Sequence, residues 1–158
     1  MRKFSEVAPE FKKFPDVETK LPTRATAQSA GYDFCSKEEY TIMPGCRHVF
    51  WTDVKAEMFF DNYLAIFTRS GNGCKRGIVL ANSVGVIDSD YCGNPDNDGN
   101  IGICLVNTSD ELFKVNIGDR IAQGIFERYL ITDDDVYRFE SGKSETSSRN
   151  GGFGSTGV

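Results

Sequence analysis

The sequence predicts an all-β domain, either a barrel or a sandwich, and three observations favour this fold class. Apolar runs of four to seven residues recur along the chain, clusters of Gly, Pro, Asn and Asp separate them, and helical periodicity is scarce. Short strands at regular spacing, with turn residues between them, are typical of β-barrels and β-sandwiches. The expected strands cover residues 40–43, 48–54, 63–68, 77–81, 101–107, 112–115, 120–126 and 136–139.

The expected elements differ in how their apolar residues are arranged. The runs LAIF (64–67) and GIVLA (77–81) are apolar on both faces, which predicts strands buried both in the core and against a neighbouring subunit. The segment GVID (85–88) is expected to be the end of a strand. One short helix is expected just after Ser70, within the glycine-rich sequence RSGNG.

The composition divides the chain into three parts. Residues 1–20 are expected to be a partly irregular extension, and residues 21–140 to form the β domain. In residues 141–158, twelve of eighteen residues are Gly, Ser or Thr, so this arm cannot pack a core and is expected to be flexible. Because the arm carries one large aromatic residue, Phe153, with Arg149 upstream, we interpret it as a lid that stacks on a flat ligand and binds anionic oxygens.

The overall composition excludes several classes of function. A chain of 158 residues with a net charge of −5 fits one globular domain and argues against nucleic acid as a partner, because phosphate backbones bind basic surfaces. No apolar run approaches the roughly 20 residues of a membrane helix, and the N-terminus has no apolar signal core, so we expect no membrane association and a cytoplasmic location. Five cysteines without C-x-x-C spacing predict free thiols rather than disulfides or a zinc site.

Two segments combine side chains suited to chemistry on a nucleotide. In GVIDSDYCGN (85–94), Asp88 is placed to hold a water molecule for attack and Tyr91 to lay a flat ring against a sugar. In TRSGNGCKRG (68–77), a guanidinium, a hydroxyl and free N–H groups at a helix start form a site for phosphate oxygens. No nucleophilic Ser, Cys or Lys with a neighbouring base is evident, so hydrolysis by a carboxylate-activated water is the simplest mechanism.

Two further motifs have simpler explanations when taken alone. The sequence GDRIAQ (118–123) is expected to be a surface turn with an Asp119–Arg120 pair entering a strand. The sequence NPDNDGN (94–100) partly matches a calcium-binding loop, but Leu105 stands where the bidentate Glu belongs. We therefore interpret residues 94–100 as a hairpin loop with type I′-like turn residues.

Taken together in chain order, five motifs resemble the homotrimeric dUTP diphosphatase (dUTPase) family. The resemblance covers residues 21–158, and five ordered motifs are far more specific than any one of them. The motifs are SAGYDF (29–34), RSGNGCKRGIVLANSVGVID (69–88), GVIDSDYCG (85–93), GDRIAQGIFE (118–127) and RNGGFGSTG (149–157).

The resemblance implies a jelly-roll-like β-barrel subunit and a trimer with three shared active sites. It implies Mg²⁺-dependent hydrolysis of dUTP to dUMP and pyrophosphate, which limits uracil incorporation into DNA and supplies dUMP for dTMP synthesis. Asp88 is the implied catalytic residue, and Asp33 the implied contact to Mg²⁺ through water. The implied substrate-binding residues are Arg69, Ser70, Gly71, Asn82, Val86, Ile87, Tyr91, Gly102, Gln123, Arg149, Phe153, Gly154, Ser155 and Thr156.

The family also implies a division of labour among these residues. Asn82 and main-chain groups near Gly102 read the uracil edge, and Tyr91 stacks under the deoxyribose and leaves no room for a 2′-OH. Arg69 and Gln123, with Ser70 and Gly71, bind phosphates. From another subunit, Phe153 covers the uracil while Arg149, Ser155 and Thr156 contact the outer phosphates.

The chain departs from the family pattern at several positions. Cys92 replaces the usual Arg after Tyr91, and Asn72–Gly73 replaces an apolar–small pair, which is expected to loosen the short helix. The loop 94–99 is longer than usual, so it is the first candidate for contact with a regulatory protein partner. Two other functions stay open from the sequence: a dCTP deaminase-like enzyme of the same fold, and a regulatory binding protein with a dUTPase fold.

Overall fold

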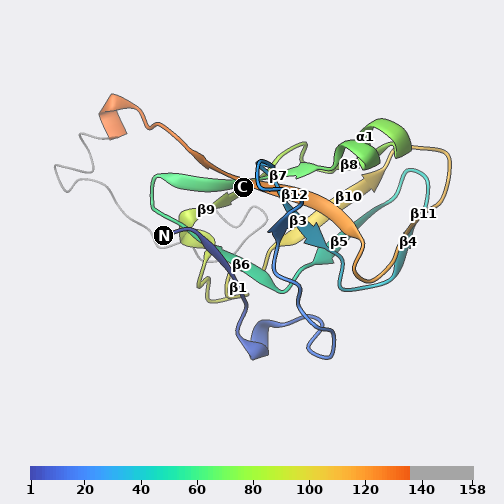
Figure 1. The fold of residues 1–158 in the computed structure, drawn as a ribbon, viewed down its shortest axis with the longest axis horizontal. Helices are drawn as coiled ribbons and strands as arrows, with labels where there is room; N and C mark the ends of the chain where they lie inside the picture. Colours follow the sequence, from blue (N-terminus) through green and yellow to red (C-terminus); the bar gives the residue numbers. More distant parts are fainter. Residues whose placement is uncertain (136–158) are drawn as a thin grey trace.

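The computed structural model describes residues 1–135, and within this part the regular secondary structure is mainly β-strand (Figure 1). The all-β prediction is therefore confirmed. The strands are β1 (Lys3–Glu6), β2 (Thr23–Arg24), β3 (Tyr32–Cys35), β4 (Tyr40–Ile42), β5 (Arg47–Trp51), β6 (Val54–Glu57), β7 (Asn62–Thr68), β8 (Ile78–Leu80), β9 (Gly85–Asp88), β10 (Gly102–Asn107), β11 (Phe113–Val115) and β12 (Arg120–Arg128). The helices bounded within the described residues are the α-helix α1 (Ser70–Arg76) and the 3-10 helices η1 (Pro9–Phe11) and η2 (Ser89–Tyr91).

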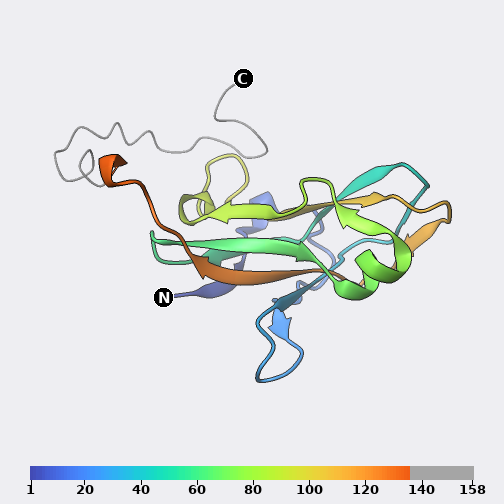
Figure 2. The same ribbon diagram turned by 90° about the horizontal axis from the view of Figure 1, so that it is seen from above.

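Two sheets face each other across the hydrophobic core (Figure 2). The larger sheet has the strand order β2-β3-β12-β7-β9, and the smaller has the order β5-β10-β8. Their inward side chains alternate along the strands, as in β10, where Ile103 and Leu105 are buried and the residues between them are partly exposed. Phe34, Leu64 and Phe50 are fully buried between the layers.

The strand predictions agree with the structure over most of the chain, but β2 and β3 were not among the expected strands, and one expected strand is divided in two. The run 48–54 was expected to be one strand, but the structure divides it into β5 and β6 at Thr52–Asp53. Asp53 adopts a φ of 55°, which an extended strand cannot contain, and its carboxylate is fully buried. The expected strand 136–139 lies outside the described residues.

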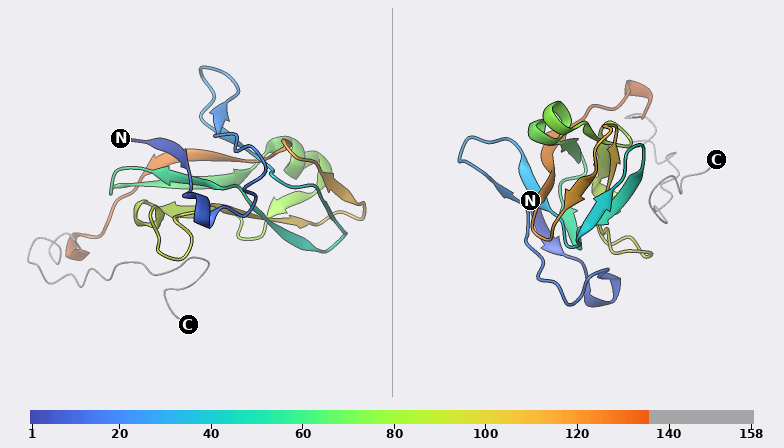
Figure 3. Two further views of the ribbon diagram at one scale, coloured as in Figure 1. Left: turned by 90° about the horizontal axis from the view of Figure 1, so that it is seen from below. Right: turned by 90° about the vertical axis from the view of Figure 1, so that its right-hand side faces the viewer.

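Residues 1–20, expected to form a partly irregular extension, contain one regular strand. β1, near the marked N-terminus in Figure 3, pairs antiparallel with β6. Val7, which follows β1, is buried. Asp53 accepts hydrogen bonds from the backbone N–H groups of Lys13 and Phe14, at 2.8 and 3.0 Å. The N-terminal residues thus pack against β6 and its flanking loops, while the domain boundaries at residues 20 and 140 stay predictions.

The short helix α1 forms where the sequence predicts it, and both Asn72 and Gly73 make close contacts there. The amide of Asn72 is buried and donates to the carbonyl of Ile121 at 3.4 Å. A side chain at Gly73 would approach Thr68 Cγ2 to 3.1 Å, so glycine lets the helix lie close to the end of β7. The helix ends at Gly77, whose φ of 65° is the left-handed conformation that favours glycine.

The five cysteines are free thiols, as the sequence predicts. Burial raises the pKa of Cys35, Cys92 and Cys104, which makes these thiols weaker nucleophiles.

Among residues 1–135, no helix has the length and apolar character needed to cross a bilayer.

Candidate active site

The predicted phosphate-binding residues gather around Asp33. Because side chains alternate along β3, Phe34 points into the core and Asp33 points to the opposite face. There its Oδ1 accepts a hydrogen bond from Arg69 Nε at 2.9 Å, and its Oδ2 accepts one from Arg120 at 3.2 Å. Both guanidinium groups therefore lie at one carboxylate, with Arg69 at the start of α1.

Gln123 lies beside this cluster. It pairs with Asp33 in the register of β12 and β3, and its side-chain amide donates to the carbonyl of Thr68 at 3.3 Å. A Cβ at Gly31 would stand 2.5 Å from Gln123 Oε1, so the glycine of the SAGYDF motif makes room for this side chain. Ser70 and Gly71 are exposed at the start of α1, with open space around Gly71.

One member of this cluster was misjudged from the sequence. Arg120 was expected to pair with Asp119 in a surface turn, but the Asp119 carboxylate accepts hydrogen bonds from the backbone N–H and side chain of Asn116. Arg120 instead reaches Asp33, which is 87 residues away in the sequence. Only the β3–β12 pairing brings the two side chains together. The sequence feature that could have predicted a role for Arg120 in this cluster is the GDRIAQ motif, because it contains both Arg120 and Gln123.

A second group of predicted residues surrounds the end of β9. β9 is an edge strand that pairs with β7, and Gly85 is required by packing because a side chain there would approach Ile66 Cβ to 3.1 Å. Val86 is exposed, Ile87 and Asp88 are half-buried, and Asp88 ends the strand.

Tyr91 follows Asp88 in η2 and is buried, with an exposed fraction of 6%. Its hydroxyl donates to the carbonyl of Asn100 at 3.0 Å and accepts from the side-chain amide of Asn97 at 2.7 Å. The sequence reasoning singled out Tyr91 but missed both asparagines, because a ring partner six or nine residues along a loop has no local pattern.

Asn82 is exposed in the turn between β8 and β9, directly after Ala81. The N–H of Ala81 donates to the carbonyl of Cys104 at 3.0 Å, so this turn begins beside β10, the strand that starts at Gly102. An exposed side-chain amide beside a strand with main-chain groups suits the reading of a base edge.

The two groups are far apart within one chain. Three strand pairings separate the two carboxylates. Asp33 on β3 lies opposite Gln123 on β12, and Gln123 lies opposite Phe67 on β7. Asp88 on β9 lies opposite Tyr63, which is four residues before Phe67 on β7. Three strand spacings of about 4.8 Å and four residues of about 3.3 Å place the Cα atoms of Asp33 and Asp88 roughly 20 Å apart. Figure 2 shows the same separation, with α1 near one end of the molecule and η2 near the other.

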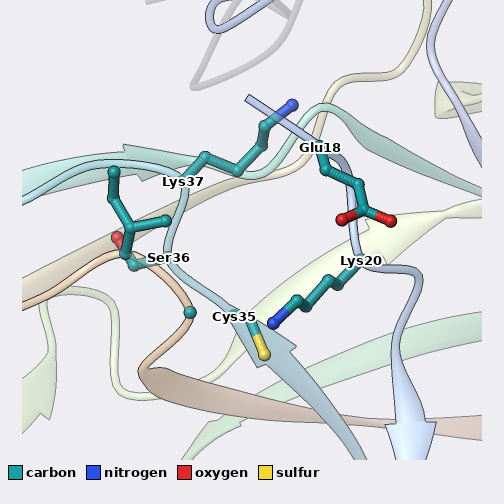
Figure 4. Close-up of a pocket in the computed structure, with 7 residues that line it drawn as sticks. Glu18, Lys20, Cys35, Ser36 and Lys37 are labelled. Carbon is teal, nitrogen blue, oxygen red and sulfur yellow. The ribbon is translucent and has the colours of Figure 1, made fainter. Parts of the chain in front are cut away.

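Two cavities in the described part of the chain lie away from this gap. A cavity of about 20 Å³ lies between residues 18–20 and 35–37, where the side chains of Lys20 and Cys35 face each other (Figure 4). That volume holds about one water molecule and no nucleotide. A larger hollow of about 650 Å³ lies at the N-terminal strand, against Phe4, Tyr32 and Phe126. Neither cavity is lined by Asp88 or Arg69.

The calcium interpretation of residues 94–100 is not supported. Within the described part of the chain, no group of three or more His, Cys, Asp or Glu side chains could hold a metal ion. Asp98 instead accepts from the N–H of Ala8 and the ammonium of Lys55, both at 2.7 Å. The predicted type I′ turn is confirmed, because Asp98 and Gly99 have φ angles of 55° and 80°. The predicted hairpin is wrong: the loop leads from η2 to β10, and β9 and β10 belong to different sheets.

The carboxylates of the site suit a metal ion that binds together with a phosphate ligand, rather than an ion that the protein alone holds. Both oxygens of Asp33 are engaged by arginines, but each carboxylate oxygen has a second lone pair that can accept from a metal-bound water. Mg²⁺ keeps several waters and binds phosphate oxygens readily. The predicted arm residues Arg149, Phe153, Gly154, Ser155 and Thr156 lie outside the described residues.

Comparison with known proteins gives a consistent result. The dUTPase family profile matches residues 17–157. The deoxyuridine 5′-triphosphate nucleotidohydrolase of Lactococcus lactis is 40% identical over 146 residues, which cover 92% of this chain and 93% of that protein. The enzyme of the same name from vaccinia virus (strain Copenhagen) is 41% identical over 140 residues, covering 88% and 86% of the two chains.

Solved structures agree with the sequence comparisons. The crystal structure of the Streptococcus mutans dUTPase superposes with a TM-score of 0.72 at 40% identity, covering 82% of this chain and 98% of the other. The dUTPase of phage phi11 of Staphylococcus aureus, at 21% identity, has a TM-score of 0.66 and covers 84% of this chain and 93% of the other, so it shares the fold.

Proposed function

This chain belongs to the dUTPase family, and we propose that it hydrolyses dUTP to dUMP and pyrophosphate in active sites shared between the subunits of a homotrimer. The proposal that the site is shared rests on the distance between Asp33 and Asp88 within one chain. A single triphosphate cannot bridge roughly 20 Å from the arginines at Asp33 to the carboxylate at Asp88. One copy therefore supplies the β9 group and a second copy supplies the arginine cluster.

Asp88 is the proposed general base. Its carboxylate accepts a proton from a water molecule whose oxygen attacks the α-phosphorus, and pyrophosphate leaves as the new P–O bond forms. The position at the end of an edge strand leaves the carboxylate half-exposed, where a water molecule can reach it. A general base contributes about 10²–10⁴-fold to the rate, so its loss is measurable.

The nucleoside is proposed to bind along β9 and the start of β10. Asn82 and the main chain near Gly102 read the uracil edge, with Val86 and Ile87 in contact through the edge strand. Cytosine presents the opposite hydrogen-bonding pattern and leaves buried groups unpaired, which disfavours it strongly. Tyr91 stacks on the deoxyribose, and its fixed ring excludes a 2′-OH.

The triphosphate is proposed to bind the arginine cluster of another copy. Arg69, Ser70, Gly71 and Gln123 supply donors to the phosphate oxygens. When bound, Mg²⁺ neutralises negative charge on the phosphates, and Asp33 is the residue suited to hold one of its waters.

The arm and the cellular setting complete the proposal. Arg149, Phe153, Gly154, Ser155 and Thr156 come from a further copy, with Phe153 over the uracil and the polar residues on the outer phosphates. We place the reaction in the cytoplasm, without nucleic acid or a membrane as partner.

A substrate panel tests this function directly. Pyrophosphate release is measured from dUTP and the four common dNTPs, with and without Mg²⁺, for the wild type and for D88N, with D110N as the matched surface control. We expect release from dUTP alone among these nucleotides, dependence on Mg²⁺, and a loss of at least 10²-fold in kcat for D88N only. Ammonia release from dCTP, or near-normal turnover by D88N, would contradict the proposal.

A further inference from the structure

The hydroxyl of Tyr91 is fixed by the loop 94–100. Asn97 donates to the hydroxyl at 2.7 Å, and the hydroxyl donates to the carbonyl of Asn100 at 3.0 Å. Both partners belong to the segment 94–100, which lies directly after η2. The orientation of the ring is therefore set from one side by this loop.

The loop itself is held by its own turn. The side-chain oxygen of Asn97 accepts from the N–H of Gly99 at 2.9 Å, and the N–H of Asn100 donates to the carbonyl of Asn97 at 2.9 Å. A Cβ at Gly99 would stand 2.6 Å from the carbonyl oxygen of Tyr91, so the turn packs against the backbone of the residue that it supports. Asn97 thus uses its oxygen for the turn and its NH₂ for the phenol.

Contacts with other segments fix the loop in the fold. Asp98 accepts from the N–H of Ala8 and from Lys55, both at 2.7 Å. Asn100 donates to Asp53 at 3.0 Å and to the carbonyl of Phe11 at 3.2 Å. The N-terminal segment and β6 therefore hold the two ends of the turn that contacts Tyr91.

We propose that Asn97 is a positioning residue that sets the specificity of this enzyme for deoxyribose, by holding the ring of Tyr91 through its hydroxyl. The inference rests on the proposed function, because it requires that Tyr91 stack on the sugar. A ring held at its hydroxyl cannot retreat to admit an additional oxygen atom at the sugar. Without Asn97 the hydroxyl keeps its bond to the Asn100 carbonyl but loses its second anchor, and a shift of the ring by a fraction of an ångström is enough to admit that atom.

Two substitutions at Asn97 separate the bond to the phenol from the bond to the turn. N97A removes both, whereas N97D keeps the acceptor for Gly99 and removes the donor to Tyr91. In N97D the single phenol proton faces two acceptors, the new carboxylate and the carbonyl of Asn100, so one of the two bonds is lost. D96N is the matched control, because Asp96 is exposed in the same loop.

The measurement compares dUTP with UTP. We expect N97A to lower the ratio of kcat/KM for dUTP over UTP about tenfold, N97D to lower it less, and D96N to leave it unchanged. UTP binding is also measured by competition against dUTP, and UTP should compete better against N97A than against the wild type. A ratio that is unchanged in both Asn97 variants would overturn the proposal.

A double-mutant cycle with Y91F tests whether Asn97 acts through the phenol. Y91F keeps the ring and removes the hydroxyl, so adding N97A to Y91F should change the ratio little if the proposal holds. Additive effects would overturn it, as would a loss of activity with no change in the ratio. Each variant is assayed below its own melting temperature, and N97D provides the result if N97A fails to fold. If the wild type does not hydrolyse dUTP, the proposed function fails; if it does and the ratio is unchanged, only this inference fails.

Discussion

The Oδ1 atom of Asp33 lies 2.9 Å from Arg69 Nε, which joins β3 to the start of α1 across 36 positions of sequence. The carboxylate is largely covered, with a side-chain exposed fraction of 13%, while that of Arg69 is 30% exposed. The guanidinium is therefore fixed at its Nε and keeps its outer face open to a ligand. Preorganised cations of this kind stabilise charge that develops on a phosphate.

Replacing Asp33 is expected to affect turnover more than binding. In D33N, Arg69 loses its charged partner and its fixed position, so we expect kcat for dUTP to fall about tenfold. Removal of the negative charge favours phosphate binding, so KM should not rise. Steady-state kinetics test this split, with E39Q as the control, because Glu39 forms only an exposed pair with Lys114. A higher KM with an unchanged kcat would show that Asp33 acts otherwise.

Mixing two inactive variants should restore activity if the sites are shared. D88N and R69A are co-expressed with different tags, and trimers that contain both chains are purified. In every trimer that contains both chains, one of the three sites takes an intact Asp88 from one copy and an intact Arg69 from the next, so about a third of wild-type activity is expected. Trimers of each variant alone are the controls. If mixed trimers are as inactive as these, each site lies within one chain.

The buried carboxylate of Asp53 should make stability depend on pH. Burial alone would raise its pKa, but hydrogen bonds from Lys37, the N–H of Lys13, Asn100 and the N–H of Phe14 outweigh burial and hold the pKa below its usual value. A carboxyl with a lowered native pKa contributes stability above its unfolded pKa of about 3.9, and this contribution is lost as the pH falls through the lower native pKa.

D53N breaks the buried pair with Lys37, whose Nζ lies 2.9 Å from Asp53 Oδ2. We expect a loss of about 3–5 kcal/mol in the free energy of unfolding at pH 7, because the lysine ammonium is left buried without a counter-charge. The loss should shrink as the pH falls below about 4. Urea unfolding from pH 3 to pH 7 measures it, with D16N as an exposed control. An equal loss at every pH would contradict the pKa argument.

Gly124 in β12 is expected to tolerate no side chain. A Cβ there would stand 2.8 Å from Phe34 Cε2 and 3.0 Å from Leu64 Cδ1, both in fully buried residues. G124A should therefore lower the free energy of unfolding by about 1–3 kcal/mol through overpacking. Thermal unfolding checks this value. G71A is the stability control, since nothing lies within 4 Å of the Cβ it would add.

The sequence by itself identified the catalytic candidates, because their signals are local. Asp88 and Tyr91 are three residues apart, and Arg69 directly precedes the helix that the glycine-rich run predicts. The alternation of apolar residues predicted most strands for the same reason, since a period of two is read within a few residues. The family resemblance, which depends on the order of such motifs, is confirmed.

Only the tertiary structure decided which of these local units meet. Asp33 finds Arg120 through the pairing of β3 with β12, and Tyr91 is held by Asn97 through a turn whose conformation depends on Asp98 and Gly99. Such contacts depend on which strands pair and in which register, and burial of the whole core sets that choice rather than any local preference. The distance between Asp33 and Asp88, on which the proposal of a shared site rests, follows from that pairing.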